Sequence, residues 1–445
     1  MTAGTQQAKT PAVTSARAVA TEVCADLRRG EFLDQSFERR VIALDARDRR
    51  WTRELVYGML RRRARIDALL APRVHGSLAR LDGDVLDLLR LGVYQLLEMG
   101  SVPAYAAIAQ TVELVKRRHG LAPSRLVNAV LRRLDRERAD FGLLIPEEIT
   151  ERLALTYSHP QWLVARWIER FGAEDTERLL SLNDAEATLI VRPFGIVREQ
   201  LEATLESTEI TVTEAPLVSD SLALTGHVSL TELGAFRQGQ MFVQDPAATL
   251  VTMYAAIPPG SVVGDLCAAP GGKAIELSRG ATVVVAADRS FARLQRLVAN
   301  RRRLDIANLF PLVADAKSPA VRPLDAILLD VPCTGTGTLR RHPDARWRLK
   351  VSDIAVMAVT QRTILKSAAS AVKPGGLLIY STCSLEPEEN DAQIEIFLGA
   401  NPDWRLAPPP DGAVPSEALD EGFLRVLPHV HRTDGAFAAR LRRLS

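Results

Sequence analysis

The sequence lacks the features that mark several common classes of protein. Its four cysteines form no CxxC pair, so a zinc ribbon or a thioredoxin-type site is disfavoured. No apolar run approaches the roughly 18–20 residues of a membrane span, and the polar start MTAGTQQAKTPAVTSA has no apolar secretory stretch. Aromatic residues make up only 5% of the chain, which provides no stacking platform of the usual RNA-reader kind. We therefore expect a cytoplasmic monomer with free cysteines and with no metal or membrane partner.

The charge of the 445-residue chain is small in total but unevenly distributed. Lys and Arg number 56 and Asp and Glu 54, which gives a net charge of +2. Residues 1–140 carry 25 basic against 17 acidic residues, a surplus of 8, so residues 141–445 carry 31 against 37. The basic N-terminal third indicates a nucleic-acid partner, although a solvated helical surface would show the same bias. The length allows two or three domains, each with its own core.

The first third of the chain has a helical pattern throughout. Apolar residues recur at spacings of three and four in 53–71, 85–99 and 104–118. Strand signals are absent. We predict a disordered tail over 1–15, followed by an all-α bundle over 16–140.

Beyond the bundle the hydrophobic period changes twice. Residues 147–172 continue as helices, and the alternating runs 189–194 and 208–216 then predict strands, so 146–234 should form a small α+β lobe. From 235 to 445 strands alternate with helices, which indicates a doubly wound, Rossmann-like α/β domain with a mostly parallel sheet. The predicted strands of this domain are 261–267, 282–288, 308–315, 325–330 and 375–382, with a closing antiparallel hairpin at 423–431 and 436–444.

The segment DLCAAPGGKA, residues 265–274, links the first of these strands to its helix. Gly271 and Gly272 allow a tight turn and the close approach of a ligand to the backbone, as in Rossmann folds. The segment is not a GxGxxG dinucleotide loop. It is not a phosphate loop either, because that motif needs Gly and Ser or Thr where Cys267 and Ala274 stand.

The next three predicted strands each end on an acid, namely Asp288, Asp315 and Asp330. Asp288 lies 17 residues after Gly271, where a carboxylate can accept hydrogen bonds from ribose hydroxyls. Asp315 could meet an adenine amino group, and Asp330 faces the reacting end of the predicted pocket. A single Asp at a strand end is as often a turn former, but three in register indicate an adenosine-type ligand. Without a phosphate-binding loop, S-adenosylmethionine fits better than NAD.

Cys333 and Cys383 follow the fourth and fifth predicted strands, in DVPC and STCS. Neighbouring parallel strands lie roughly 4.8 Å apart, so both thiols should face one pocket. Free cysteines are more often buried filler than nucleophiles. However, a thiolate that adds to C6 of a cytosine makes C5 nucleophilic enough to take a methyl group, which is covalent catalysis.

Two sets of segments resemble known families. RELVYGMLRR, LRLGVYQLLEM, VPAYAAIAQTVEL and LVNAVLRRL resemble the NusB-type RNA-binding helical domain, which implies an RNA role for the basic face. Many of these residues serve only the core. DLCAAPGGK, DVPCTGTGTLRRHPDARW and YSTCSLEPEEN closely resemble the RsmB/Fmu (Sun) group of the NOL/NOP/Sun RNA cytosine-5 methyltransferases. That group joins a NusB-like domain to the catalytic one, so the resemblance spans the whole chain.

The resemblance implies a role for each matching residue. The nucleophile falls on Cys383, and Cys333 takes the role of the second cysteine, which helps to release the methylated product. Asp330 would also steady the cytosine, and Lys273 could orient Asp330, although a Lys at a helix start is as often a surface charge. The S-adenosylmethionine site falls on Cys267, Ala268, Ala269, Pro270, Gly271, Gly272, Lys273, Asp288, Asp315 and Asp330.

The choice of nucleophile stays open on local sequence alone. DNA cytosine-5 methyltransferases also have a Pro-Cys after the fourth strand, and there that cysteine attacks, so Cys333 is a candidate. The second cysteine in TCS, the lack of an ENV triplet and the RNA-type N-terminal domain favour Cys383.

The segment RRHPDARWR, residues 340–348, has two interpretations. Arg340, Arg341, His342 and Arg346 could hold the RNA backbone near a flipped base. Alternatively, Arg346 and Trp347 belong to a loop packed on the sheet. We favour the RNA contact, because the segment follows directly from the Cys333 turn.

Together these features predict an S-adenosylmethionine-dependent 16S rRNA (cytosine-C5)-methyltransferase. It would form 5-methylcytosine during rRNA processing, on a base taken out of its stack, with ribosomal RNA or a small-subunit assembly intermediate as its partner. One alternative is the same chemistry on tRNA or another RNA. Another is an RNA-binding or ribosome-assembly factor without turnover, which the intact cysteine pair disfavours because a pure binder needs no thiols there.

Overall fold

The computed structural model describes residues 13–137, 145–206, 210–226 and 228–444. The chain divides into two compact units, which we call unit 1 and unit 2. Unit 1 comprises Met1–Asp184 and His342–Arg348, and unit 2 comprises Ala185–Arg341 and Leu349–Ser445. Residues 1–12 of the predicted tail lie outside the described residues, as do residues 138–144 between bundle and lobe.

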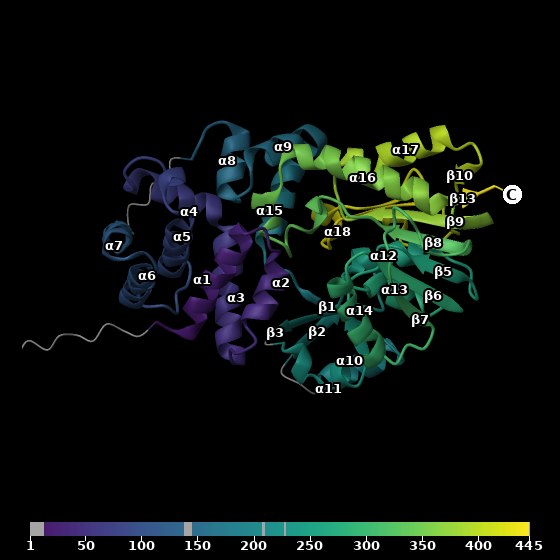
Figure 1. Ribbon diagram of the computed structural model, residues 1–445, viewed down its shortest axis with the longest axis horizontal. Coiled ribbons are helices and arrows are strands. Elements are labelled where there is room, and N and C mark those ends of the chain that lie inside the picture. Colours follow the sequence, from purple (N-terminus) through teal and green to yellow (C-terminus); the bar gives the residue numbers. More distant parts are fainter. Residues whose placement is uncertain (1–12, 138–144, 207–209, 227, 445) are drawn as a thin grey trace, which may run out of the picture. The chain divides into compact units, whose positions relative to one another are not determined.

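Unit 1 is helical, as the periodicity predicts, and the apolar faces of its helices between Ser15 and Arg136 form one core (Figure 1). The predicted all-α bundle is therefore confirmed. No helix in the described ranges is long and apolar enough to cross a membrane. The helices of this unit are α1 (Ser15–Arg28), α2 (Leu33–Arg40), α3 (Ala46–Arg61), α4 (Arg63–Leu70), α5 (Gly83–Leu97), α6 (Ala104–His119), α7 (Leu121–Arg136), α8 (Ile149–Thr156), α9 (Gln161–Asp184) and α15 (Ala345–Arg348), with short 3-10 turns η1 (Ala71–Arg73) and η2 (Leu78–Arg80).

Local signals explain several ends of these helices. Asp45 accepts a hydrogen bond from the backbone N–H of Asp48 at 2.8 Å and so caps the start of α3. The predicted continuous helix over 53–71 is broken at Arg62, whose φ of −99° and ψ of 7° separate α3 from α4. Apolar spacing does not register such a one-residue break, because the stripe continues on both sides of it.

The segment His342–Arg348 belongs to unit 1 and is held there by its Arg and Trp side chains. The Arg346 side chain is 0% exposed and donates hydrogen bonds to the backbone oxygens of Tyr157, Ser158 and Asn183. The indole N–H of Trp347 donates to the backbone oxygen of Leu60 at 2.8 Å. Both side chains therefore serve the fold of unit 1.

This placement changes the interpretation of Arg346. Burial lowers the pKa of Arg346 to about 9, and the nearby Asp184 only partly offsets the desolvation. A guanidinium with no exposed surface cannot reach an RNA phosphate, so the structure does not support the RNA contact expected of Arg346. The packed-loop alternative is nearer to the structure, because the loop packs on helices of unit 1.

Unit 2 begins with a small antiparallel sheet in the strand order β2-β3-β1-β4. Its fourth strand, Met241–Val243, lies beyond residue 234, where the predicted lobe ends. The sequence analysis did not predict this strand, because a run of three residues is too short to show a period. The boundary between the two units also falls inside the predicted lobe 146–234, at Asp184, since α8 and α9 belong to unit 1. The predicted domain boundaries therefore stay a prediction. The elements are β1 (Leu189–Pro193), α10 (Arg198–Glu206), β2 (Ile210–Glu214), β3 (Leu222–Gly226), η4 (Leu230–Glu232), α11 (Gly234–Arg237) and β4 (Met241–Val243).

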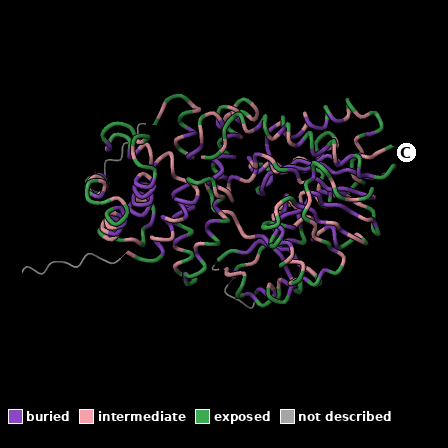
Figure 2. Tube along the Cα trace, in the orientation of Figure 1, coloured by how far each residue is buried: buried purple, intermediate pink, exposed green. Residues whose placement is uncertain are grey.

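The main sheet of unit 2 has nine strands, in the order β11-β12-β13-β9-β8-β5-β6-β7, with β10 paired to β13. Helices α12, α13 and α14 cover one face, and α16 and α17 cover the other (Figure 1). The central strands are buried along most of their length (Figure 2). The bounds are α12 (Pro246–Ala255), β5 (Val262–Asp265), α13 (Gly272–Leu277), β6 (Val283–Asp288), α14 (Phe291–Arg303), β7 (Leu309–Val313), β8 (Leu324–Asp330), η5 (Thr336–Thr338), α16 (Val351–Ala369), β9 (Val372–Thr382), η6 (Pro387–Glu389), α17 (Asp391–Ala400), β10 (Trp404–Leu406), η7 (Ser416–Ala418), β11 (Leu419–Asp420), β12 (Phe423–Val426), α18 (Pro428–His431) and β13 (Ala436–Arg443).

The strand pairing confirms the predicted Rossmann-like sheet. β5 pairs in parallel with β6 and β8, and β8 with β9, whereas β13 is antiparallel to β9 and β12. The chain leaves β5 toward β6 and β7 and then returns to β8, so the strand order reverses beside β5. Such a switch point is where open α/β sheets bind ligands. One predicted run, 423–431, is too long: Pro428 has no N–H for the ladder and begins α18 instead.

Replacement of Arg346 by Ala tests its structural role. We expect Arg346→Ala to lower the free energy of unfolding by about 2–4 kcal/mol, because three backbone oxygens and Asp184 lose their buried partner. Arg348→Ala is the matched control, since Arg348 is exposed and its pair with Asp344 should contribute less than about 1 kcal/mol. Thermal unfolding checks both. If Arg346→Ala loses RNA affinity while its unfolding midpoint is unchanged, Arg346 contacts RNA and the structural role is wrong.

Candidate active site

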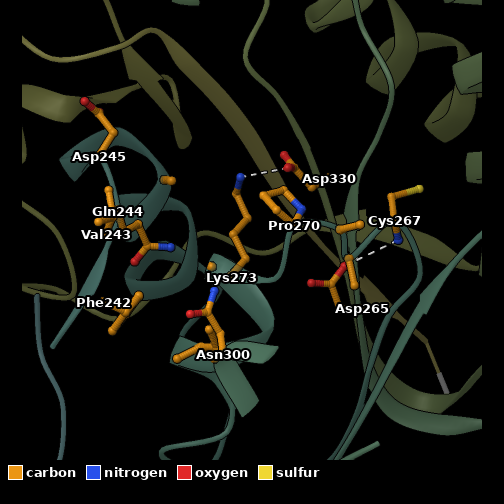
Figure 3. Close-up of a pocket in the computed structure, with 15 residues that line it drawn as sticks. Phe242, Val243, Gln244, Asp245, Asp265, Cys267, Pro270, Lys273, Asn300 and Asp330 are labelled. Carbon is orange, nitrogen blue, oxygen red and sulfur yellow. Dashed lines mark hydrogen bonds and ion pairs between the residues drawn. The ribbon is translucent and has the colours of Figure 1, made fainter. Parts of the chain in front are cut away.

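A pocket in unit 2 lies at the carboxyl ends of β5 and β8 (Figure 3). Its wall on the sheet side is the turn after β5, and its opposite wall comes from β4 and the start of α12. The predicted residues that line it are Cys267, Ala268, Ala269, Pro270, Gly272, Lys273 and Asp330. Phe242, Val243, Gln244, Asp245, Ala248, Asp265, Ile275 and Asn300 complete the lining.

The turn between β5 and α13 depends on its two glycines. Gly271 has φ of 116°, and a Cβ there would lie 2.9 Å from the Leu297 side chain. A Cβ on Gly272 would lie 3.0 Å from Nε2 of Gln244. The turn therefore needs glycine for its conformation and for the space that it leaves against the pocket.

Of the three predicted acids, the structure brings only Asp330 to the pocket wall. Asp288 is 3% exposed and accepts a hydrogen bond from the backbone N–H of Ala269 at 3.3 Å, so it supports the turn from beneath. Asp315 is exposed and accepts from the backbone N–H of Lys317 at 2.9 Å, which is the arrangement of a turn former.

Lys273 and Asp330 form an ion pair at the end of the pocket nearest β8 (Figure 3). Nζ of Lys273 lies 2.8 Å from Oδ2 of Asp330, and Ser381 donates to Oδ1 at 3.0 Å. Burial acts to lower the pKa of Lys273, but the charges of Asp330 and, to a smaller degree, Cys383 and Asp265 outweigh it and raise the pKa. Lys273 is therefore an ammonium held by Asp330, as proposed from the sequence, and not a surface charge.

Asp265 is a site residue that the sequence analysis missed. It is 0% exposed at the end of β5, accepts from the backbone N–H of Cys267 at 3.4 Å, and leaves Oδ2 without a hydrogen-bond partner in the described structure. Burial and the nearby Asp330 raise the pKa of Asp265 to about 7. Its signal was present in the sequence, because it is an acid at a strand end like the three that were considered.

Gln244 is a second missed residue, and no local signal marks it. It is buried, its Oε1 accepts from Thr249 at 3.0 Å, and its Nε2 has no hydrogen-bond partner among the described residues. Its segment precedes the first strand of the main sheet by about twenty residues, so only the tertiary fold places it opposite the β5 turn.

The structure brings Cys333 and Cys383 into contact. Their sulfurs lie 3.3 Å apart, and both cysteines are free thiols. The backbone N–H of Gly337 donates to the backbone oxygen of Cys383 at 2.9 Å, and a Cβ on Gly337 would lie 2.7 Å from that oxygen. Gly337, the second glycine of TGTG, therefore allows the two turns to approach each other.

A buried carboxylate, Glu389, joins the two cysteine turns and was also missed. Its Oε2 accepts from the backbone N–H of Thr334 at 2.9 Å and from Nε2 of Gln361 at 2.8 Å. Its Oε1 accepts from Ser384 at 2.6 Å and from the Thr334 hydroxyl. Burial raises the pKa of Glu389, and these donors act in the opposite direction.

The two thiols do not have the same surroundings. The contact with the Cys383 sulfur, burial, and the negative charges of Cys383 and Glu389 raise the pKa of the Cys333 thiol well above its ordinary value. Cys383 interacts with the Lys273 ammonium, whose pKa the charge of Cys383 helps to raise. At neutral pH the pair therefore favours a protonated Cys333.

The arginines that precede His342 are engaged within unit 2. Arg340 donates to the backbone oxygen of Glu186 at 2.6 Å. Arg341 bridges Asp245 and Asp434 at 2.6 and 2.7 Å. In unit 1, Nδ1 of His342 lies 3.1 Å from a carboxylate oxygen of Asp34. The structure therefore shows these predicted RNA contacts occupied by protein partners.

The pocket suits S-adenosylmethionine. Buried Asp265 and Gln244 each present an unpartnered polar atom, and the glycine turn leaves room against the backbone. Acidic side chains outnumber Lys273 around it, which favours a sulfonium cation over an anionic phosphate. No group of three or more potential metal ligands occurs among the described residues. The fold and the site together define an S-adenosylmethionine-dependent methyltransferase of the Rossmann-like class.

Comparison with known families agrees with this class. The model of the family described as "16S rRNA methyltransferase RsmB/F" matches residues 254–442. The NusB family matches residues 14–136, and a ferredoxin-like domain of RsmF/B-like methyltransferases matches residues 159–231.

Individual relatives cover nearly the whole chain. A probable ribosomal RNA small subunit methyltransferase B from Synechocystis is 36% identical over 96% of this chain and 99% of the relative. The protein of the same description from Bacillus subtilis is 31% identical over 97% and 99%. The crystal structure of PH0851 superposes with a TM-score of 0.82 and 27% identity, over 98% of this chain and 100% of that one. The chain belongs to the RsmB/F methyltransferase family, so the predicted resemblance and cofactor are confirmed.

The raised pKa of Asp265 predicts an unusual dependence of stability on pH. Its pKa is about 7 in the folded protein and about 4 when unfolded, so the folded state binds more protons between these values, and this carboxyl lowers stability as the pH rises through them. Asp265→Asn should therefore gain stability over the wild type by up to about 4 kcal/mol between about pH 4 and about pH 8. Unfolding midpoints across this range check the prediction.

Asp325→Asn provides a control of opposite sign. Lys373 and the backbone N–H of Val262 hold the pKa of Asp325 below its usual value, so its stabilising effect is present at neutral pH and is lost as the pH falls. A difference between Asp265→Asn and the wild type that does not change with pH would contradict the proposed state of Asp265.

Proposed function

We propose that this protein forms 5-methylcytosine in 16S ribosomal RNA through a covalent bond between Cys383 and C6 of the cytosine. The observation that carries the proposal is the pair of free thiols with sulfurs 3.3 Å apart, next to the Lys273–Asp330 ion pair at the pocket end. Bound S-adenosylmethionine supplies an electrophilic methyl group in this pocket. A binding protein would have no use for two converging thiols at that place.

The electrostatics support Cys383 as the attacking residue. Two thiolates in contact repel each other, so only one of the pair ionises readily. Burial and Glu389 disfavour the anion at Cys333, whereas the Lys273 ammonium attracts an anion at Cys383. The Cys383 thiolate adds to C6, and the electron pair of the C5–C6 double bond moves so that C5 can take the methyl group.

The same electrostatics give Cys333 its part in product release. Once Cys383 is bonded to C6, its sulfur carries no charge, and two of the causes that raise the pKa of Cys333 disappear. The Cys333 thiol can then lose its proton to water, and the resulting thiolate takes the C5 proton. The C5–H electrons re-form the ring double bond as the bond between C6 and Cys383 breaks, which restores the Cys383 thiolate.

The remaining predicted residues are assigned to binding. Asp330, held by Lys273 and Ser381, faces the reacting end and would steady the cytosine. Cys267 to Lys273 would hold the methyl donor by resemblance to the family, and the positions of Asp288 and Asp315 at the ends of predicted strands assign them to the ribose and the adenine. Burial and neighbouring acids raise the pKa of Cys267, which suits a binding residue more than a nucleophile.

Ribosomal RNA is the substrate that the relatives favour. Relatives that match nearly all of this chain are described as ribosomal RNA small subunit methyltransferase B, and the basic N-terminal third resembles a NusB-type RNA-binding domain. Methylation of tRNA and RNA binding without turnover remain the competing outcomes.

Single substitutions distinguish the roles of the two cysteines. Cys383→Ala should abolish methyl transfer, with kcat reduced by at least about 1,000-fold, because no adduct can form. Cys333→Ser should instead accumulate a covalent protein–RNA adduct, visible as a gel-shifted band that contains S-adenosylmethionine-derived label. An adduct that survives loss of Cys383 but not loss of Cys333 would reverse the two roles.

The RNA substrate is decided by bisulfite mapping. RNA from cells with and without the protein should differ at a cytosine of 16S rRNA, and the purified protein with S-adenosylmethionine should restore that mark. A difference confined to tRNA would favour the first alternative. No difference in any RNA, together with retained RNA binding, would favour the assembly factor.

A further inference from the structure

Glu389 stands apart from the pocket, yet its contacts converge on both cysteine turns. It is 0% exposed at the end of η6. Thr334 follows Cys333 in the chain, and Ser384 follows Cys383; both donate to the Glu389 carboxylate. One side chain therefore holds the residue immediately after each thiol.

A second path reaches the other side of Cys333. Gln361 on α16 donates from Nε2 to Glu389 at 2.8 Å and to the backbone oxygen of Pro332 at 3.0 Å. Pro332 precedes Cys333, so the carboxylate and its partners hold the Cys333 turn at both flanks. In addition, the Tyr380 hydroxyl donates to the backbone oxygen of Glu389 at 2.6 Å, which anchors the acid to β9.

The donors indicate the charge of this side chain. The backbone N–H of Thr334 and Nε2 of Gln361 can only donate, and both point to Oε2, while the Thr334 and Ser384 hydroxyls lie within hydrogen-bond distance of Oε1. Four donors are what a buried carboxylate anion needs to offset its desolvation. These donors favour the carboxylate form of Glu389 beside the thiol pair and act against the burial that raises its pKa.

The charged and titratable groups around the two sulfurs are few. The charge of Glu389 acts on Cys333, and the charge of Cys333 acts on Tyr380, whereas Cys383 interacts with Lys273, itself paired with Asp330. The negative group thus lies toward one thiol and the positive group toward the other. This asymmetry is built by residues that do not themselves line the pocket, apart from Lys273 and Asp330.

We propose that Glu389 is a positioning residue, which holds the Cys333 and Cys383 turns in contact and reserves the thiolate for Cys383 by keeping a negative charge beside Cys333. The catalytic consequence rests on the proposed cytosine methylation. The difference between the two thiols does not, because it is a property of the protein alone.

The first test measures thiol reactivity without RNA. The full-length protein is treated with limiting iodoacetamide over a range of pH, and mass spectrometry reports alkylation at Cys333 and Cys383 separately. In the wild type Cys383 should react first. In Glu389→Gln, which keeps the size but removes the charge, the pH midpoint of Cys333 alkylation should fall by about one unit. Glu389→Asp retains the charge and should keep a midpoint near that of the wild type.

The adjacent Glu388 provides a matched control, because it is exposed and carries the same side chain at the neighbouring position. Glu388→Gln should leave the alkylation profile unchanged. A Cys333 midpoint in Glu389→Gln equal to that of Glu388→Gln would overturn the proposal, whatever reaction the protein catalyses.

The second test concerns positioning. Glu389→Gln and Glu389→Asp should both lower kcat for RNA methylation by about tenfold or more, with S-adenosylmethionine affinity changed less than about threefold, because the thiols and not the donor are misplaced. If the wild type does not methylate RNA but the pH midpoint of Cys333 alkylation still falls in Glu389→Gln, the proposed function is wrong. The role of Glu389 at the thiol pair would then still hold.

Two milder variants keep the proposal testable if the Glu389 variants do not fold. Thr334→Val and Ser384→Ala each remove one hydroxyl donor and leave the carboxylate in place. Each should reduce the ratio of Cys383 to Cys333 alkylation, because each frees the turn that it holds. Unchanged ratios in both variants would overturn the proposal.

Discussion

The parallel pairing of β8 with β5 and β9 is the constraint on which the rest of the site depends. It sets Asp330 opposite Ser381 in register, so the chain leaves both strands at the same edge of the sheet. Cys333 lies three residues after Asp330, and Cys383 two residues after Ser381. A shift of the register by one residue would turn these side chains to the other face and separate the thiols from Lys273.

Buried charge is arranged around that edge so that each group has a defined partner. Lys273 and Asp330 neutralise each other, and Glu389 has four hydrogen-bonding partners on its two oxygens. Among the described residues, Asp265 has one backbone donor, to Oδ1, and no partner for Oδ2. The incomplete solvation of Asp265 destabilises its anion. A carboxylate with incomplete hydrogen bonding, such as Asp265, suits a site that binds a cationic ligand. Glu389, whose two oxygens both have hydrogen-bond partners, suits a structural role.

Sequence reasoning succeeded where the signal is local or periodic. Helical spacing predicted the bundle of unit 1, and buried apolar runs predicted β5 to β9 because a strand covered on both faces must be apolar throughout. It also gave the glycine turn and the Lys273–Asp330 contact. It missed Glu389 and Gln244, because an acid in a short turn and an amide before the first main strand carry no pattern. Arg346 was misjudged for the same reason: burial of an arginine depends on carbonyls from α8, α9 and their connection.

The sequence by itself determined the class of the protein, because the alternation of strands with helices, the Gly271 turn and the two cysteine motifs are properties of short segments. Only the tertiary structure decided how the two thiols differ. Cys333 and Cys383 are chemically identical and stand in similar turns, so their difference must come from charges brought in by other segments: Glu389 from the turn after β9, and Lys273 from the start of α13. A charge acts through distance in space, and distance between remote segments is what folding alone establishes.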